Sequence, residues 1–273
     1  MISTQKRTLP CFSMQDKVCL VTGGARGLGL EFARAFVISG CTQLVILDLK
    51  QAEADSAAKE LLDSARENGI DLTGLDLIGI ECDVASEESV KIAFDQTRKR
   101  FGRVDAVVAS AGIVENYPAL EYPFDRARKL FDINVHGAYL TAREAAKVMI
   151  PNGGGSIVLV ASMSASIVNV PQPQTPYNAS KAAVKHMATS LAIEWAKTGV
   201  RRHNSSPGYT LTKLTKTILA GKPELKETWE RLTPIGRLAE PEDLAGAVVF
   251  LASDASKFMT GTDLLIDGGY CAI

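Results

Sequence analysis

A glycine-rich segment near the N-terminus constrains the fold of this chain more than any other feature. The segment, Thr22-Gly23-Gly24-Ala25-Arg26-Gly27-Leu28-Gly29, follows an apolar run at 17–22 whose length and β-branched residues predict a buried strand. Beyond it, apolar residues recur at helical spacing: Leu28, Phe32, Ala35 and Phe36. Between a strand and a helix, such glycines let backbone N–H groups approach a pyrophosphate at the helix N-terminus. The segment therefore predicts a dinucleotide-binding turn.

Asp48 indicates which dinucleotide this turn would hold. It follows the next predicted strand, 43–47, and lies nineteen residues beyond Gly29. A carboxylate there accepts hydrogen bonds from the ribose hydroxyls and repels the 2′-phosphate of NADP, which favours NAD. Arg26 keeps NADP as an alternative, because its cation is able to contact that phosphate, to lie against the adenine or to stay solvated.

Predicted strands and helices alternate along the rest of the chain. Strands are expected at 75–80, 104–109, 156–161, from 200 onward and at 263–266, and helices at 51–67, 86–100, 124–149, 176–198 and 241–252. Ser86 is a plausible helix cap, and Pro241 suits a first helical turn. This alternation predicts an α/β fold, a Rossmann-type doubly wound seven-stranded parallel sheet. We expect an N-terminal extension, residues 1–15, and a single domain, residues 16–273.

Composition narrows the class of partner. Lys and Arg number 30 and Asp and Glu 31, so no basic field exists to hold nucleic acid or an anionic membrane, and the apolar runs are too short to span a bilayer. Five cysteines without a C-x-x-C pair indicate free thiols in a reducing compartment, and three scattered histidines argue against a metal site. The first fifteen residues lack the apolar stretch of a signal peptide, so a cytoplasmic location is expected.

The glycine segment and the pair Tyr177 and Lys181, spaced Y-x-x-x-K, together resemble the short-chain dehydrogenase/reductase family from about residue 17 to the C-terminus. Asp267-Gly268-Gly269 resembles the ending of that family. The resemblance implies an NAD(P)-dependent alcohol dehydrogenase whose catalytic residues are Asn134, Ser162, Tyr177 and Lys181. It also implies the residues that contact the cofactor: Gly23, Arg26, Gly27, Leu28, Gly29, Asp48, Asp83, Val84, Ser110, Tyr177, Lys181, Pro207, Gly208, Thr210 and Thr212.

Tyr177 and Lys181 have the spacing that general acid–base chemistry requires. Four residues apart on a helix, they share one face. A neighbouring ammonium and an oxidised nicotinamide would both lower the tyrosine pKa from its usual value of about 10. Tyr177 then takes the alcohol proton during oxidation and returns it during reduction. Ser162 would hold the substrate oxygen, and Asn134 would orient a water that links Lys181 to solvent. Taken singly, each of these residues also suits an ordinary structural role.

Some stretches are most similar to fungal polyol dehydrogenases, a group that includes D-arabinitol dehydrogenases, sorbose reductases and mannitol dehydrogenases. This similarity favours a polyol and ketose as the substrate pair, with D-arabinitol and D-ribulose first. Candidate lining residues are Tyr117, Tyr122, Asn169, Gln172, Gln174 and Tyr209. An apolar ketone, such as a 3-oxoacyl thioester or a steroid, and a non-catalytic cofactor-binding scaffold are the alternatives. The family resemblance also implies a homotetramer built on the helices at 124–149 and 176–198.

Three departures from the family pattern stand out. Ala109-Ser110-Ala111-Gly112 replaces a motif usually written N-N-A-G. Arg202 and His203 fall in the sixth strand, where apolar or amide side chains are expected, and burying an unpaired charge there would be costly. Fifteen residues separate Ser162 from Tyr177, two more than expected, so Ser164 competes for the role of catalytic serine.

Overall fold

The computed structural model describes residues 8–273, and these form one α/β unit around a parallel sheet. The sheet has seven strands in the order β3-β2-β1-β4-β5-β6-β7, and every neighbouring pair is parallel. The strands are β1 (Val18–Thr22), β2 (Gln43–Asp48), β3 (Asp76–Glu81), β4 (Ala106–Ala109), β5 (Gly155–Val160), β6 (Val200–Pro207) and β7 (Thr262–Ile266). The expected doubly wound seven-stranded sheet is confirmed.

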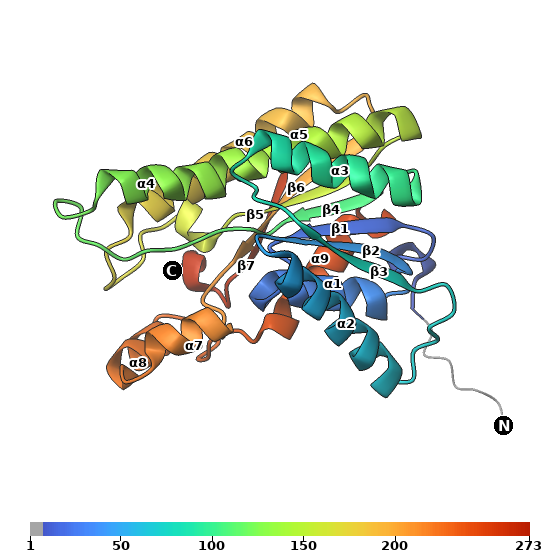
Figure 1. Cartoon of the computed structure of the whole chain (residues 1–273). Coiled ribbons are helices and arrows are strands. Elements are labelled where there is room, and N and C mark those ends of the chain that lie inside the picture. The colour runs from blue at the N-terminus through green and yellow to red at the C-terminus, as the bar shows by residue number, and fades with distance from the viewer. Residues whose placement is uncertain (1–7) are drawn as a thin grey trace.

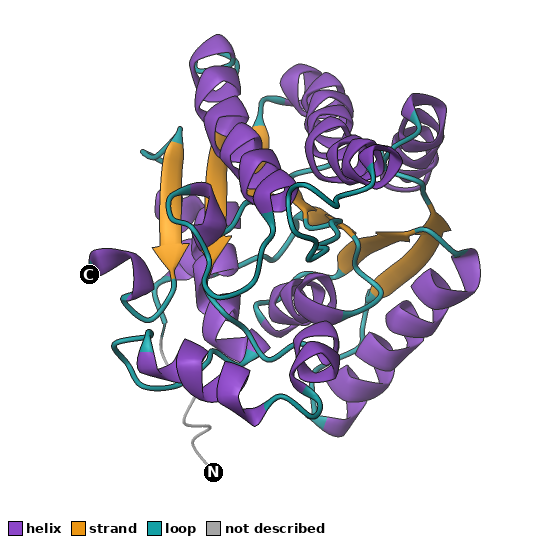
Figure 2. Cartoon of the chain, turned by 90° about the vertical axis from the view of Figure 1, so that its left-hand side faces the viewer, coloured by secondary structure: helices purple, strands orange, loops and turns teal. Residues whose placement is uncertain are grey.

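Helices cover both faces of the sheet (Figures 1 and 2). In order along the chain they are α1 (Gly27–Ile38), α2 (Gln51–Glu67), α3 (Glu87–Phe101), α4 (Phe124–Phe131), α5 (Gly137–Met149), α6 (Thr175–Glu194), α7 (Lys213–Leu219), α8 (Pro223–Arg231) and α9 (Ala245–Ala252). One apolar core packs α1, α2 and α9 against the sheet, and the other packs α3, α5 and α6 on the opposite face. Because both faces are covered, the central strands are buried along their whole length.

The sequence signals for helix boundaries are mostly confirmed. The Ser86 hydroxyl accepts a hydrogen bond from the backbone N–H of Ser89 and caps α3. Pro241 opens a short 3-10 turn that leads into α9. The helix expected at 124–149 is helical throughout, but a π-helical turn at Asp132–His136 divides it into α4 and α5. The sequence did not predict α7 and α8, which lie away from the sheet in Figure 1.

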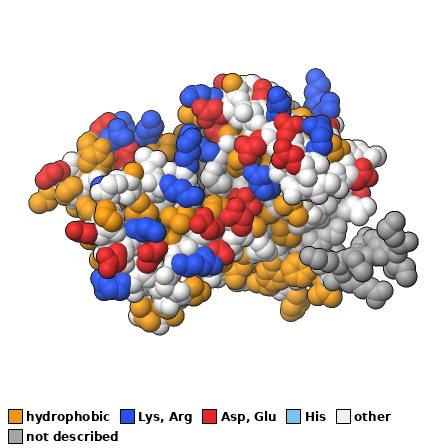
Figure 3. Space-filling model, turned by 90° about the horizontal axis from the view of Figure 1, so that it is seen from below, with side chains coloured by type: hydrophobic (Ala, Val, Ile, Leu, Met, Phe, Trp, Pro, Cys, Tyr) orange, Lys and Arg blue, Asp and Glu red, His pale blue; other side chains and the backbone are white. Residues whose placement is uncertain are grey.

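The proposed N-terminal extension falls partly outside the described residues, since the description begins at residue 8. Within the described part, Met14 is completely buried in the core that contains α1. No helix among residues 8–273 is long and apolar enough to cross a membrane. Acidic and basic side chains are interspersed over the face seen in Figure 3.

Strand β6 carries the unusual pair of basic residues into the interior. Arg202 and His203 are both completely buried. The three guanidinium nitrogens of Arg202 have no hydrogen-bond partner within the described chain. The ring of Trp195, 4.8 Å away, and the charge of Glu194 partly compensate for its burial. Arg201 points to the other face, where it donates to the carbonyl oxygens of Leu251 and Ser253. The strand keeps its parallel register with β5 and β7 despite this burial.

Candidate active site

The loops at the carboxyl ends of the strands enclose a cavity of about 430 Å³. Ligands of open parallel sheets bind at this edge. The structure brings every residue assigned to the cofactor from the sequence to the lining of this one cavity: Gly23, Arg26, Gly27, Leu28, Gly29, Asp48, Asp83, Val84, Ser110, Tyr177, Lys181, Pro207, Gly208, Thr210 and Thr212. Ser162 lines it as well, whereas Asn134 lies behind its wall. Within residues 8–273, no cluster of acids, cysteines and histidines is arranged to hold a metal.

The glycine turn leaves the N-terminus of α1 open to the cavity. Gly23 and Gly27 both have positive φ angles, +63° and +58°, which glycine adopts without strain. A Cβ at Gly29 would lie 2.2 Å from the carbonyl oxygen of Gly23, so this contact of turn and helix requires glycine. No side chain of the N-cap residue, Arg26, caps the helix. The first N–H groups of α1 are therefore available to an anionic group, and the turn fits a pyrophosphate.

Asp48 is held rigidly beside this turn. One carboxylate oxygen accepts the backbone N–H of Ala25 at 3.0 Å and the other accepts that of Leu49 at 2.8 Å. Arg26 is instead largely exposed, and its nearest acid is Glu53 at 3.9 Å. This part of the cavity therefore has a fixed carboxylate, Asp48, and a loosely held guanidinium, Arg26.

Tyr177 and Ser162 meet at the far end of the cavity from Asp48. Ser162 is the neighbour that favours the ionised form of the Tyr177 phenol, and its Oγ lies 3.0 Å from that of Ser164. Ser162 therefore suits the role of catalytic serine better than Ser164, although both line the cavity. The expected lowering of the Tyr177 pKa relied on an oxidised nicotinamide as well as on Lys181, so it stays a prediction for the enzyme with its cofactor bound. Burial raises the pKa of the phenol, and Ser162 opposes that rise.

Lys181 is buried one helical turn beyond Tyr177. Its Nζ donates to the carbonyl oxygen of Val160 at 2.7 Å and lies 5.8 Å from the centre of the Tyr177 ring. Burial lowers the pKa of this ammonium to about 8. The distance explains why the lysine does not offset the burial of the phenol, because the charge is aimed at a backbone oxygen rather than at the tyrosine hydroxyl.

Asn134 sits in the π-helical turn between α4 and α5. Its amide nitrogen donates to the carbonyl oxygen of Ile113 and to the hydroxyl of Ser180, and its amide oxygen accepts the N–H of Ile113. A Cβ at Gly112 would lie 3.2 Å from Asn134 Oδ1 and 3.6 Å from Lys181 Nζ, so the amide and the ammonium flank this glycine. Asn134 thus braces the loop after β4, close to Lys181 but without a direct bond to it.

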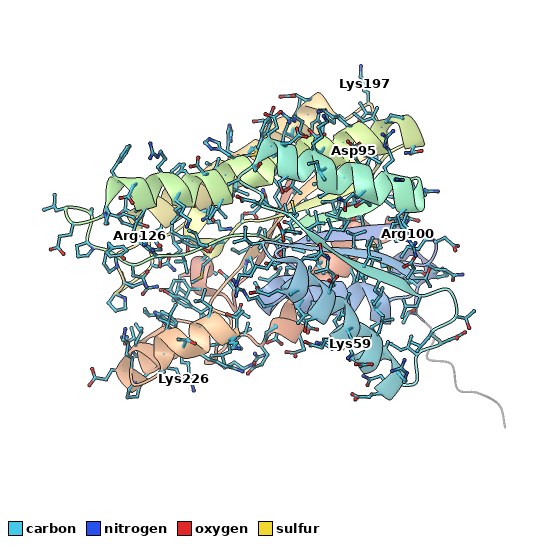
Figure 4. All side chains as sticks on the ribbon, in the orientation of Figure 1. Lys59, Asp95, Arg100, Arg126, Lys197 and Lys226 are labelled. Carbon is cyan, nitrogen blue, oxygen red and sulfur yellow. The ribbon has the colours of Figure 1, made fainter. Side chains whose placement is uncertain are left out.

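Four of the six candidate substrate residues line the cavity: Asn169, Gln172, Gln174 and Tyr209. They bond to one another, and Tyr209 stacks on Trp229 with ring centres 4.0 Å apart. Tyr117 and Tyr122 lie outside the cavity, which corrects the sequence-based expectation. Their rings pack edge to face, and the Tyr122 hydroxyl bonds to Glu115, which also pairs with Arg126 (labelled in Figure 4).

Sequence reasoning missed the residues that α7 and α8 contribute to the cavity. Leu214, Thr215 and Ile218 come from α7, and Trp229 comes from α8. A proline at the first turn of α8 and the Thr212 cap of α7 were signals for these helices. No pattern in the sequence marked Trp229, because a single tryptophan on a short polar helix has no distinctive spacing.

Comparison with known proteins gives a consistent family. A family model described as "Enoyl-(Acyl carrier protein) reductase" matches residues 23–271. The chain is 37% identical over 268 residues to a D-arabinitol 2-dehydrogenase [ribulose-forming] of Scheffersomyces stipitis, covering 96% of each protein. It is also 37% identical to a probable NADP-dependent mannitol dehydrogenase of Yarrowia lipolytica, covering 97% of the chain and 91% of that relative.

A solved structure has the same architecture. The crystal structure of a short-chain type dehydrogenase/reductase from Mycobacterium marinum superimposes with a TM-score of 0.88 at 35% identity. The alignment covers 96% of this chain and 98% of that one. The match to these relatives therefore includes nearly the whole chain, with both the sheet and the loops at its carboxyl edge.

Proposed function

Because the chain belongs to the short-chain dehydrogenase/reductase family, we propose that it is an NAD-dependent polyol dehydrogenase that interconverts D-arabinitol and D-ribulose. The observation that carries the proposal is the continuity of one cavity. Asp48 ends β2 and Ser162 follows β5, with β1 and β4 between these strands, so the glycine turn and Asp48 line one side of the cavity and Ser162, Tyr177 and Lys181 the other. Such an arrangement suits a dinucleotide whose reactive ring lies beside an acid–base group.

The residues of this chain supply the proton chemistry. The glycine turn and Asp48 would hold the dinucleotide, and its nicotinamide would supply the hydride acceptor for the carbinol carbon. Tyr177 takes the hydroxyl proton in that direction and donates it to the developing alkoxide in the other. Ser162 hydrogen-bonds the same oxygen and stabilises its charge. Lys181 remains mainly protonated at neutral pH, because its pKa of about 8 lies above 7, and it supplies positive charge at this end.

Asp48 supports NAD as the preferred cofactor. Its two oxygens are fixed by backbone N–H groups, so the carboxylate is unable to turn away from a 2′-phosphate. Arg26 is drawn toward Glu53 and is mostly solvated, so it compensates little of that repulsion. Because the mannitol dehydrogenase relative is a probable NADP-dependent enzyme, NADP is the alternative to be tested in parallel.

The polar end of the cavity supports a polyol as substrate. Asn169, Gln172, Gln174 and Tyr209 bring amide and hydroxyl groups suited to several substrate hydroxyls. The alternative substrate class is an apolar ketone. Met163 and Ile218 add apolar surface to the cavity, and the matching family model is described as a reductase of an acyl substrate. The convergence of Ser162, Tyr177 and Lys181 argues against a scaffold without chemistry.

We further propose a homotetramer in the cytoplasm. Exposed apolar side chains lie on the helices that the family resemblance places at subunit contacts: Phe124 on α4, Tyr139 on α5 and Ile193 on α6. Light scattering should give the mass of four chains, and cell fractionation should recover the protein with the cytosol. A monomeric mass would contradict the proposed assembly.

The direct test of the proposed function is nicotinamide reduction with a panel of pentitols and hexitols, with NAD and NADP offered in parallel. We expect the highest kcat/KM with D-arabinitol and NAD. Tyr177→Phe should lower kcat by about 100-fold or more, the usual contribution of a positioned proton donor. Tyr122→Phe is the matched control, because it removes a phenol outside the cavity and should preserve kcat. A folded protein that oxidises no polyol with either nucleotide would refute the proposal.

A further inference from the structure

The polar side chains at the substrate end form a hydrogen-bonded chain whose direction is set by Trp229. The indole Nε1 of Trp229 lies 3.2 Å from Oε1 of Gln172. An indole N–H only donates, so the amide oxygen of Gln172 must face it. The amide nitrogen of Gln172 then faces the Tyr209 hydroxyl, 2.8 Å away, and donates to its oxygen. One donor-only group therefore fixes the first two orientations.

The same direction continues toward the reaction centre. Asn169 donates its Nδ2 to the Tyr209 oxygen at 3.1 Å. The Asn169 oxygen accordingly faces Gln174 and accepts from its Nε2 at 2.8 Å. The same Nε2 donates to Oδ1 of Asn178 at 2.9 Å. The Asn169 oxygen, oriented through Tyr209, sets the nitrogen of the Gln174 amide on this side.

This orientation leaves the amide oxygen of Gln174 free. Gln174 Oε1 has no hydrogen-bond partner among residues 8–273, and it is not sealed from solvent, because the residue lines the cavity. The Nε2 of the same amide lies 3.4 Å from Ser164 Oγ, which is 3.0 Å from Ser162 Oγ. The Gln174 amide therefore lies next to Ser164, which in turn contacts Ser162, the serine assigned to the reacting oxygen.

We propose that Gln174 determines substrate specificity by accepting a hydrogen bond from the hydroxyl on the carbon next to the reacting carbinol. The inference rests on the proposed function and extends it, since it assigns the preference for a vicinal polyol to one atom, Gln174 Oε1. A simple secondary alcohol or an apolar ketone leaves this oxygen unpaired once the cavity closes around the substrate. A site built to bond a hydroxyl rejects analogues that lack it.

The test compares D-arabinitol with its 1-deoxy and 3-deoxy analogues, each of which lacks one hydroxyl next to C2. In the wild-type protein, kcat/KM should fall by at least about tenfold for one of the two analogues. Gln174→Met removes the oxygen at nearly constant volume. It should lower kcat/KM for D-arabinitol by about tenfold and change the value for that analogue by less than about twofold, so that the discrimination disappears.

Gln172→Met is the matched control, because this amide belongs to the same network but has both ends occupied. It should lower kcat/KM for all three substrates by one common factor and preserve the discrimination. If Gln174→Met does not fold, Gln174→Asn withdraws the oxygen by one methylene and should give the same loss of discrimination. Discrimination that survives in the Gln174 variant overturns the inference while leaving polyol oxidation intact. Absence of wild-type turnover with any polyol overturns both.

Discussion

Replacing the buried Arg202 by methionine should make the protein more stable. Burial lowers the pKa of this guanidinium from 12.5 to about 9, with Glu194 opposing the shift. That difference corresponds to about 5 kcal/mol against the charged form in the native state. The ring of Trp195, 4.8 Å from the guanidinium carbon, returns about 1–2 kcal/mol through cation–π attraction. Allowing for imperfect repacking, Arg202→Met should raise the free energy of unfolding by about 2–3 kcal/mol.

The assay is urea denaturation at pH 7.5 together with a thermal melt. Unfolding entropy of about 2 cal/mol/K per residue over 273 residues converts the gain into a rise of about 3–5 °C in Tm. The pH dependence has a defined sign. Below about pH 9, Arg202 is charged in both the native and the unfolded protein, so its burial lowers the free energy of unfolding by the full amount. Above that pH the native state loses the proton first, and this loss of stability decreases. The advantage of Arg202→Met should therefore be complete at pH 7.5 and shrink above pH 9.

Arg201 provides a control with the opposite expected sign. Its guanidinium donates to the carbonyl oxygens of Leu251, Ser253 and Ser256 at 2.9–3.2 Å. Arg201→Met removes the guanidinium donor from all three oxygens, although Leu251 keeps a bond from the Ser156 hydroxyl, and it should destabilise the protein by about 1–3 kcal/mol. Adjacent residues of one strand should thus respond in opposite directions. A fall in the free energy of unfolding for Arg202→Met would refute the account of an uncompensated charge.

Three further changes test the site and the strand. Burial lowers the pKa of His203 to about 4, so between pH 6.5 and 4 the unfolded chain binds a proton that the native state excludes. The wild-type protein should therefore lose about 3 kcal/mol of unfolding free energy as pH falls from 6.5 to 4, and His203→Asn should not show this loss. If the urea midpoint depends on pH equally in both proteins, this account is wrong. Asp48→Asn should raise the NADP:NAD ratio of kcat/KM by at least about tenfold, whereas an unchanged ratio would show that another group selects the nucleotide. Trp229→Phe keeps the aromatic stack but removes the N–H bond to Gln172, so KM for the polyol should rise by about two- to tenfold; an unaltered KM would mean that this bond orients nothing.

The periodicity of apolar residues in the sequence was enough to predict the elements of the layered core, but not the helices outside it. Apart from β6, whose buried residues are mostly polar, the central strands are short apolar runs, and the helices that cover the sheet have repeating apolar faces, so these elements could be predicted. The helices α7 and α8 bury little: Trp229 is the buried residue of α8, and α7 has none. Their positions depend on contacts with distant segments, such as the bond from Trp229 to Gln172, which sequence spacing does not encode.

In the candidate site, too, the sequence predicted the positions of the residues but not their electrostatic environment. Glycines, Asp48, Ser162, Tyr177 and Lys181 have fixed spacings relative to strands and helices, and the structure brings them to one cavity. Their electrostatic environment could not be predicted from spacing. The helical separation of Tyr177 and Lys181, with an oxidised nicotinamide, predicts a lowered phenol pKa. In the protein alone, burial raises that pKa, and Lys181 bonds to the Val160 carbonyl oxygen instead of to the phenol. Exposure and hydrogen-bond geometry decide such shifts, and both depend on the assembled fold.

The buried charge in β6 affects stability and leaves the chemistry of the cavity intact. The strand keeps its register beyond the two basic residues, so Pro207 still pairs with Ile266, and the N–H of Gly208 bonds to the Ile266 carbonyl at 2.9 Å. Pro207 and Gly208 therefore reach the cavity in position, although Arg202 lies five residues earlier in an unfavourable environment. It follows that Arg202→Met should raise Tm without changing KM for the polyol or for NAD. A variant that gained stability and lost affinity would show instead that the strained strand helps to shape the site.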